Sequence, residues 1–181
     1  MKSKSSTRSV DKNQAISLLK KEGCDESLMK HVCAVSRHAK SIAESIKAKG
    51  VVIDVDFVET AALLHDIGRC RTHGIKHGIE GAKIMEQISP DIARVCERHI
   101  GAGIDRKEAE ILGLPVKDYL PMSLEEKVIA HADNLTEGDR IVPIEETVKK
   151  FESRLGAGHP AVKRIIELND YIESLCKDEK S

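Results

Sequence analysis

An apolar segment that ends in two adjacent metal-binding side chains constrains this chain more than any other feature. Residues 61–68 read AALLHDIG, so a helix with an apolar face leads directly into His65 and Asp66. His65 follows Val58, Ala61 and Ala62 by seven, four and three positions, which are the spacings of one helix face. Burying such titratable groups costs several kcal/mol each unless they are paired or bound to a metal. The segment therefore predicts a buried polar centre at the end of a core helix.

Three other potential ligands, His31, His99 and Asp133, also lie on apolar helix faces, far from residue 65 in the sequence. Their face-sharing neighbours are Val35, Ala39, Ile42 and Ile46 for His31, Ile92, Val95 and Cys96 for His99, and Ile129 and Ala130 for Asp133. A single inward-facing histidine is usually a satisfied core residue. Several of them, one followed directly by an aspartate, favour a shared metal centre.

The order of these residues resembles a known family signature. His31, the His65-Asp66 pair and Asp133 are similar to the H…HD…D pattern of the HD superfamily of metal-dependent phosphohydrolases, and residues 64–69, LHDIGR, resemble its HDIG subset. His77 and His99 resemble the two extra histidines of binuclear HD proteins, which include the HD-GYP phosphodiesterases and the HD-type symmetrical dinucleoside tetraphosphatases. The resemblance covers about residues 26 to 140.

Two departures bear on the substrate. No GYP tripeptide follows the histidines, which counts against cyclic-dinucleotide hydrolysis. The tetraphosphatases typically carry an acid three residues and an arginine six residues after the late aspartate, where this chain has Thr136 and Asp139; Glu137 and Arg140 each come one position later. The resemblance therefore predicts the chemistry and leaves the individual substrate open.

The resemblance implies two divalent metal ions held by six side chains. His31, His65 and Asp133 would bind one ion, His77 and His99 the other, and Asp66 would bridge them. Mixed nitrogen and oxygen donors suit Mn, Fe, Co, Ni or Zn, and six donors exceed a tetrahedral structural zinc site. We assign His65, Asp66 and Arg69 to catalysis.

Positively charged side chains near the ligands are the expected substrate contacts. These are Arg69, Lys76, Arg98 and Arg140. Arg69 is the strongest candidate, because HDIG proteins commonly carry Lys or Arg there. His73 and Cys70 are interpreted as loop residues, and His131, two positions before Asp133 and thus on another helix face, is left out of the site.

These features predict a metal-dependent phosphohydrolase that uses a metal-activated water on a phosphoester or phosphoanhydride of a nucleotide or a related small phosphorylated molecule. Two alternatives stay open. The first is an HD-fold di-iron oxygenase, which uses a similar ligand set. The second is a non-catalytic metal-binding or regulatory HD module, which has the fold but catalyses no reaction.

The expected fold is an all-α, single-domain helical bundle of the HD type. The 181 residues include two Phe, two Tyr and no Trp, so the core must consist of Leu, Ile, Val and Ala, and no stretch alternates with a period of two. We expect a flexible tail over residues 1–10 and one domain over 11–181, with its core at 26–140 and closing helices at 144–178.

Several local signals set the expected helix boundaries. Asp11 with Gln14, Asp25 and Asp54 are predicted N-caps, and Ser123 with Glu126 is a predicted capping box. Residues 100–122 form an irregular segment with a short helix near 106–112, which is a candidate lid or substrate wall. The final helix, from Pro160, is expected to bury Val162, Ile165, Ile166, Leu168 and Ile172.

Composition also bears on partners and location. The net charge of −1 gives no overall basic field, so we expect no extended nucleic-acid surface. Five cysteines without a CxxC pair argue against disulfides and for reduced cytosolic thiols. No apolar run approaches a membrane span, and the N-terminus lacks the apolar region of a secretory signal. The expected location is the cytoplasm, with a small phosphorylated partner and homo-oligomerisation left open.

Overall fold

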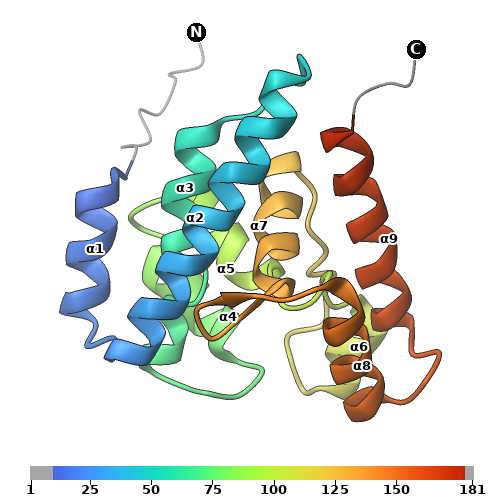
Figure 1. Cartoon of the computed structure of the whole chain (residues 1–181). Helices are drawn as coiled ribbons and strands as arrows, with labels where there is room; N and C mark the ends of the chain where they lie inside the picture. Colours follow the sequence, from blue (N-terminus) through green and yellow to red (C-terminus); the bar gives the residue numbers. More distant parts are fainter. Residues whose placement is uncertain (1–9, 178–181) are drawn as a thin grey trace, which may run out of the picture.

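The computed structural model describes residues 10–177, and they form an almost entirely helical bundle (Figure 1). The elements are α1 (Lys12–Lys21), α2 (Glu26–Ala48), α3 (Val55–Leu64), the 3₁₀ helix η1 (Ile67–Cys70), α4 (His77–Met85), α5 (Pro90–Arg98), α6 (Arg106–Ile111), α7 (Leu124–Asn134), β1 (Thr136–Glu137), β2 (Arg140–Ile141), α8 (Ile144–Leu155) and α9 (Pro160–Cys176). The predicted all-α class is confirmed. The antiparallel pair β1–β2 is a two-residue ribbon between α7 and α8. Most of the predicted tail, residues 1–9, lies outside the described residues.

The N-caps of the first three helices form as their sequences predict. Asp11 accepts the backbone N–H of Gln14 at 2.8 Å while the Gln14 side chain accepts that of Asp11 at 3.0 Å. Asp25 and Asp54 accept the N–H groups three residues ahead, at 2.8 and 2.9 Å. Each cap satisfies a donor that the helix itself leaves unpaired.

Only half of the predicted capping box forms at α7. Ser123 accepts the N–H of Glu126 at 3.2 Å, but the Glu126 carboxylate accepts the N–H of Met122 at 2.6 Å and a hydrogen bond from Arg98 at 3.2 Å. A guanidinium brought in by α5 attracts the buried carboxylate more strongly than a backbone amide does. Glu126 thereby ties the start of α7 to the end of α5.

The core lies between α2, α3 and α7, with α1 and α9 on opposite sides of the bundle (Figure 1). Small residues on α3, such as Ala61 and Ala62, are completely buried and let the helices approach closely. A second, smaller cluster of Ile104, Ala109, Leu114 and Tyr119 holds the irregular segment around α6 together. None of the helices within residues 10–177 is long and apolar enough to cross a membrane.

One residue of α9 is exposed against expectation. Val162, Ile165, Leu168 and Ile172 are buried, whereas Ile166 is 41% exposed. Adjacent positions on a helix point about 100° apart, so Ile166 lies beyond the edge of the stripe that faces α7. The prediction that Ile166 is buried was wrong.

The prediction of unpaired cysteines was also wrong. Cys24 and Cys70 form a disulfide between the α1–α2 turn and the end of η1, across 46 residues of sequence, and the remaining cysteines, Cys33, Cys96 and Cys176, are free. The odd count concealed the pair, because only the tertiary structure brings the two Cα atoms to 5.3 Å. The cysteine count therefore no longer supports a reducing compartment.

Candidate metal centre

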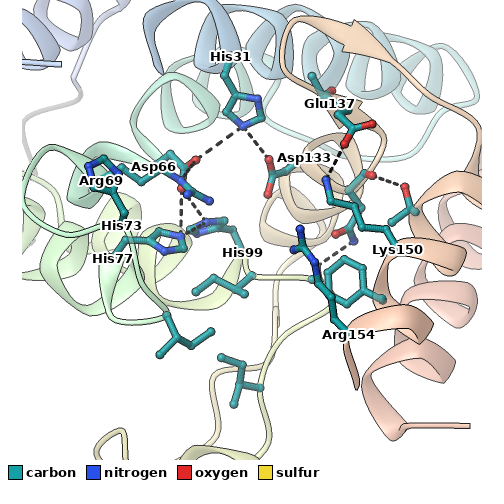
Figure 2. Close-up of a pocket in the computed structure, with 18 of the residues that line it drawn as sticks. His31, Asp66, Arg69, His73, His77, His99, Asp133, Glu137, Lys150 and Arg154 are labelled. Carbon is teal, nitrogen blue, oxygen red and sulfur yellow. Dashed lines mark hydrogen bonds and ion pairs between the residues drawn. The ribbon is translucent and has the colours of Figure 1, made fainter. Parts of the chain in front are cut away.

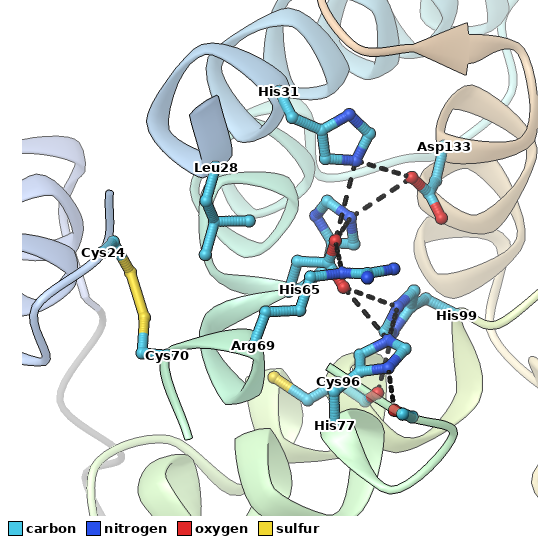
Figure 3. A network of polar contacts seen from close by, with 12 residues as sticks. Cys24, Leu28, His31, His65, Arg69, Cys70, His77, Cys96, His99 and Asp133 are labelled. Carbon is cyan, nitrogen blue, oxygen red and sulfur yellow. Dashed lines mark hydrogen bonds and ion pairs between the residues drawn. A yellow bond between two sulfur atoms is a disulfide. The ribbon is translucent and has the colours of Figure 1, made fainter. Parts of the chain in front are cut away.

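Five separate elements bring the six candidate ligands into one cluster, with His65 labelled in Figure 3 and the other five in Figure 2. His31 comes from α2, His65 and Asp66 directly follow α3, His77 opens α4, His99 caps α5 and Asp133 lies in the last turn of α7. His65, Asp66, His77 and His99 are buried, while the side chains of His31 and Asp133 are 19% exposed. The cluster is therefore enclosed on the α3–α5 side and reachable from the side of His31 and Asp133.

Asp66 lies between two groups of histidines (Figures 2 and 3). Its Oδ1 is 3.1 Å from the Nε2 atom of His77 and 3.2 Å from that of His99. Its Oδ2 is 3.7 Å from the Nε2 atoms of both His31 and His65. Asp133 completes the second group, with Oδ1 at 3.0 Å from His31 Nε2 and 3.4 Å from His65 Nε2. One carboxylate thus faces both halves of the cluster.

All four imidazole rings are held in the same way by backbone carbonyls. The Nδ1 atoms of His31, His65, His77 and His99 lie 2.9, 2.6, 2.9 and 2.8 Å from the carbonyl oxygens of Gly138, Ala62, Gly74 and Cys96. A carbonyl only accepts, so Nδ1 carries the proton and each Nε2 presents a lone pair to the centre. This arrangement is typical of metal-binding histidines, whose second nitrogen is oriented by a hydrogen bond.

The converging atoms attract positive charge. Nε2 lone pairs and carboxylate oxygens are all acceptors, and His65 Nε2 and Asp66 Oδ1 have no hydrogen-bond donor among the described residues. Burial lowers the pKa of His65, but the charges of Asp66 and Asp133 outweigh it and raise that pKa to about 9, so the two carboxylates favour a positive charge, a proton or a metal ion, at this ring. Burial raises the pKa of Asp66, yet the surrounding histidines hold it well below its usual range. The donor set therefore fits divalent metal ions, in two overlapping groups: His31, His65 and Asp133, and His65, Asp66 and His99.

Glycines set the close approach of the elements that carry Asp66, His77 and His99. A Cβ added to Gly68 would lie 1.9 Å from the carbonyl oxygen of His77, and one added to Gly78 would lie 2.8 Å from the carbonyl oxygen of Cys96. At both contacts, η1 with α4 and α4 with α5, backbone packs directly against backbone, which only glycine permits. The glycine of the HDIG stretch therefore has a steric role that spacing alone did not reveal.

The cluster lines a cavity of about 990 Å³. Of the cations expected to contact substrate, only Arg69 lines it, and Arg69 Nε donates to Asp66 Oδ2 at 2.5 Å. Lys76, Arg98 and Arg140 are not among the lining residues, and Arg98 instead binds Glu126. His73 and Cys70, which we interpreted as loop residues, do line the cavity.

Three further cations line the cavity and were missed. Lys150, Arg154 and Arg164 come from α8 and α9, the two helices to which no chemistry had been assigned. For the two α8 residues, the available signal was the spacing of four residues from Glu146 through Lys150 to Arg154, which puts all three on one helix face. Nothing in the sequence says which part of the protein that face contacts. His131 is buried beside His38 and takes no part in the cluster.

An all-α bundle with a buried histidine–aspartate cluster at the meeting point of five elements is a helical domain whose residues could hold divalent metal ions. The HD domain family model matches residues 28–138, and the chain belongs to that family. The matched range contains all six candidate ligands.

Three relatives extend the comparison. An uncharacterized protein of Methanocaldococcus jannaschii is 54% identical over 166 residues, which cover 91% of this chain and 98% of the relative. Two proteins named tRNA (cytidine(56)-2'-O)-methyltransferase, from Picrophilus torridus and Thermoplasma volcanium, are 42% and 36% identical over 92% and 91% of this chain. The chain spans 47% of the length of each methyltransferase. No solved structure gives a significant match.

Proposed function

We propose that this protein is a metal-dependent phosphohydrolase that acts on a phosphoester or phosphoanhydride of a nucleotide or a similar small phosphorylated molecule. The observation that carries the proposal is Asp66, whose two carboxylate oxygens face two separate groups of Nε2 atoms at 3.1–3.7 Å. Such a carboxylate is suited to bridging a pair of ions. When bound, a pair of divalent ions supplies an activated water at neutral pH and positive charge for the phosphoryl oxygens.

The chain's own residues have separate tasks in this reaction. The four histidines are held in fixed tautomers by backbone carbonyls, so the site needs little reorganisation before it binds a ligand. Arg69, 39% exposed and directed at Asp66 from the cavity, is placed to donate to a phosphoryl oxygen. The enclosed side, with His65 and His99, keeps bulk water away from the buried half.

The relatives favour a second source for the phosphate. Because two proteins named as tRNA methyltransferases match over nearly the whole of this chain, a phosphate on an RNA end is the second candidate substrate. Both candidates need the same site, and a panel with mononucleotides, dinucleotides and end-phosphorylated RNA oligonucleotides separates them. We also propose the cytoplasm as the location, where such substrates are abundant.

The decisive experiment is hydrolysis by metal-loaded protein, with and without oxygen. We expect phosphate release that is equally fast anaerobically and in air, supported by Mn²⁺ or Co²⁺, with labelled oxygen from water in the product. Activity that requires O₂ and is lost with Mn²⁺ would identify a di-iron oxygenase instead. Stoichiometric metal binding without turnover across the panel would identify a regulatory module.

A further inference from the structure

The cavity is much larger than the metal centre alone requires. Its volume of about 990 Å³ lies at the upper end of the roughly 300–1,000 Å³ that small-molecule sites occupy. The metal ligands line one part of the cavity, which also reaches the α1–α2 turn, several apolar side chains and α8. A ligand that fills it must therefore contact groups well beyond the cluster.

Helix α8 turns a continuous face toward the cavity. Its lining residues fall into two rows spaced by four, Glu146, Lys150 and Arg154 in one row and Thr147, Phe151 and Leu155 in the other. Residues four apart are neighbours on a helix surface, so these rows form adjacent ridges of one face. Thr147 Oγ1 donates to the carbonyl oxygen of Asn134 at 2.5 Å, one residue beyond Asp133, which fixes this face relative to the metal ligands.

Arg154 differs from the other cations around the cavity. Lys150 donates to Glu137 at 2.9 Å, Arg69 to Asp66 at 2.5 Å, and Arg164 to both Glu108 and the carbonyl oxygen of Gly103. The Arg154 guanidinium forms no hydrogen bond or ion pair with any residue between 10 and 177. In Figure 2 its side chain extends from α8 toward the space between that helix and the histidines. Among the described residues, Arg154 is thus the one cavity-lining arginine whose N–H donors are not engaged by another residue.

Part of the cavity wall is apolar. Ile100 and Ile104, which follow His99, and Phe151 of α8 line this region. These side chains suit a flat or apolar body rather than a chain of phosphates. The cavity thus offers a ligand three kinds of group: the metal ligands with Arg69, apolar side chains, and the unpaired guanidinium of Arg154.

We propose that Arg154 forms a second anion-binding subsite, and that the substrate class of this enzyme is a phosphorylated nucleoside that carries a second phosphate away from the one at the metal centre. The inference rests on the proposed phosphohydrolase function and specifies its substrate. A guanidinium recognises a phosphate through paired N–H donors, which gives it both affinity and a fixed orientation. Arg154 is a specificity residue in this scheme, while the chemistry stays at the metal centre.

The test compares nucleoside 5′-monophosphates with 3′,5′-bisphosphates of the same bases, using metal-loaded full-length protein. The wild type should prefer the bisphosphates in kcat/KM, and Arg154→Ala should reduce that preference by about 10- to 100-fold, mainly through KM. Arg154→Lys should restore part of it. The melting temperature should not change, since Arg154 is exposed and bonds no described residue.

The matched control is Lys149→Ala, which removes a neighbouring exposed cation of α8 that does not line the cavity. It should keep the wild-type preference. Equal kcat/KM for the two substrate types in the wild type, or a preference that survives Arg154→Ala, would overturn the subsite.

Calorimetry separates this inference from the proposed function. Binding of a 3′,5′-bisphosphate to metal-loaded protein should weaken by a similar factor in Arg154→Ala, whether or not the compound is hydrolysed. Binding that depends on Arg154 without any hydrolysis would support the subsite and contradict the phosphohydrolase. Hydrolysis together with binding that does not depend on Arg154 would support the phosphohydrolase and contradict the subsite.

Discussion

At the scale of single residues, ring orientation makes four histidines suitable as metal ligands. Each Nδ1 is bound to a backbone carbonyl near its own helix end or, for His31, to Gly138 of the β1–β2 turn. The rings cannot rotate without breaking that bond, so their Nε2 lone pairs point to the centre before any ion arrives. The preorganised geometry lowers the cost of binding.

The two halves of the cluster should be separable by mutation. His77→Ala or His99→Ala should leave about one metal ion per chain and a folded protein, while turnover falls by orders of magnitude, because two ions share the chemistry. Asp66→Ala should be more severe, since its oxygens face both halves. Elemental analysis and turnover of the purified variants are the measurements, with Lys163→Ala on the exposed side of α9 as control. Full metal content and normal turnover in both histidine variants would show a mononuclear site.

A second pair of histidines has a structural effect away from the cluster. His131 is 3% exposed, and its burial, followed by the charge of nearby His38, lowers its pKa to about 4. Burial also lowers the pKa of His38. A histidine that is neutral when folded, with an ordinary pKa when unfolded, stabilises the fold above about pH 6.5 and loses that contribution as the pH falls toward 4.

His131→Leu should therefore reduce the acid sensitivity of folding. Between pH 7 and pH 5 the wild type should lose roughly 2 kcal/mol of unfolding free energy through His131, because in this range the unfolded state binds a proton that the folded state does not. Denaturant titrations of both proteins at the two pH values provide the measurement. Comparing the pH dependence, rather than absolute stability, removes the effect of the changed side-chain volume. Parallel losses in both proteins would contradict the assignment.

At the scale of elements, close backbone packing positions η1 against α4. The Cβ that Gly68 lacks would meet the His77 carbonyl oxygen and, at 2.5 Å, the backbone nitrogen of Gly81. The space is therefore filled by backbone atoms that cannot rotate away. Asp66 reaches His77 because the two elements approach this closely.

Gly68→Ala should consequently separate the two halves of the site. We expect a loss of at least about 2 kcal/mol in unfolding free energy and reduced metal content, because a backbone shift must relieve the clash. Gly74→Ala is the matched control, since a Cβ there meets nothing within 4 Å. Metal analysis and chemical denaturation of both variants test the prediction. A Gly68→Ala protein as stable and as metal-rich as the control would show that η1 is not constrained in this way.

At the scale of the whole molecule, the metal centre joins helices that are far apart in the sequence. Ligands on α2, after α3, on α4, after α5 and on α7 converge, so an ion bound there links most of the bundle. An ion that binds only the folded state stabilises it in proportion to the logarithm of its free concentration.

Chelation should therefore destabilise the protein as well as inactivate it. At a free metal concentration 100 times the dissociation constant, linkage contributes about 2.7 kcal/mol, equivalent to a shift of roughly 5–10 °C in a domain of this size. Thermal melts before and after chelation, and after adding Mn²⁺ back, measure the effect. A melting temperature that does not respond to chelator or metal would contradict a resident metal centre.

The sequence by itself determined most of the helices, most of their caps, and the family. Helix caps and apolar stripes depend on residues within one or two turns, so their physics is local and readable. The H…HD…D order likewise marked a metal-dependent family, because ligand types must suit the metal wherever the chain folds.

Only the tertiary structure decided how distant segments meet. It paired Cys24 with Cys70, gave the Glu126 carboxylate to Arg98 and Met122, and brought the α8 cations to the cavity in place of Lys76, Arg98 and Arg140. Each outcome depends on which side chain reaches a partner from another element. That competition is settled by three-dimensional distance and burial, which no local spacing in the sequence encodes.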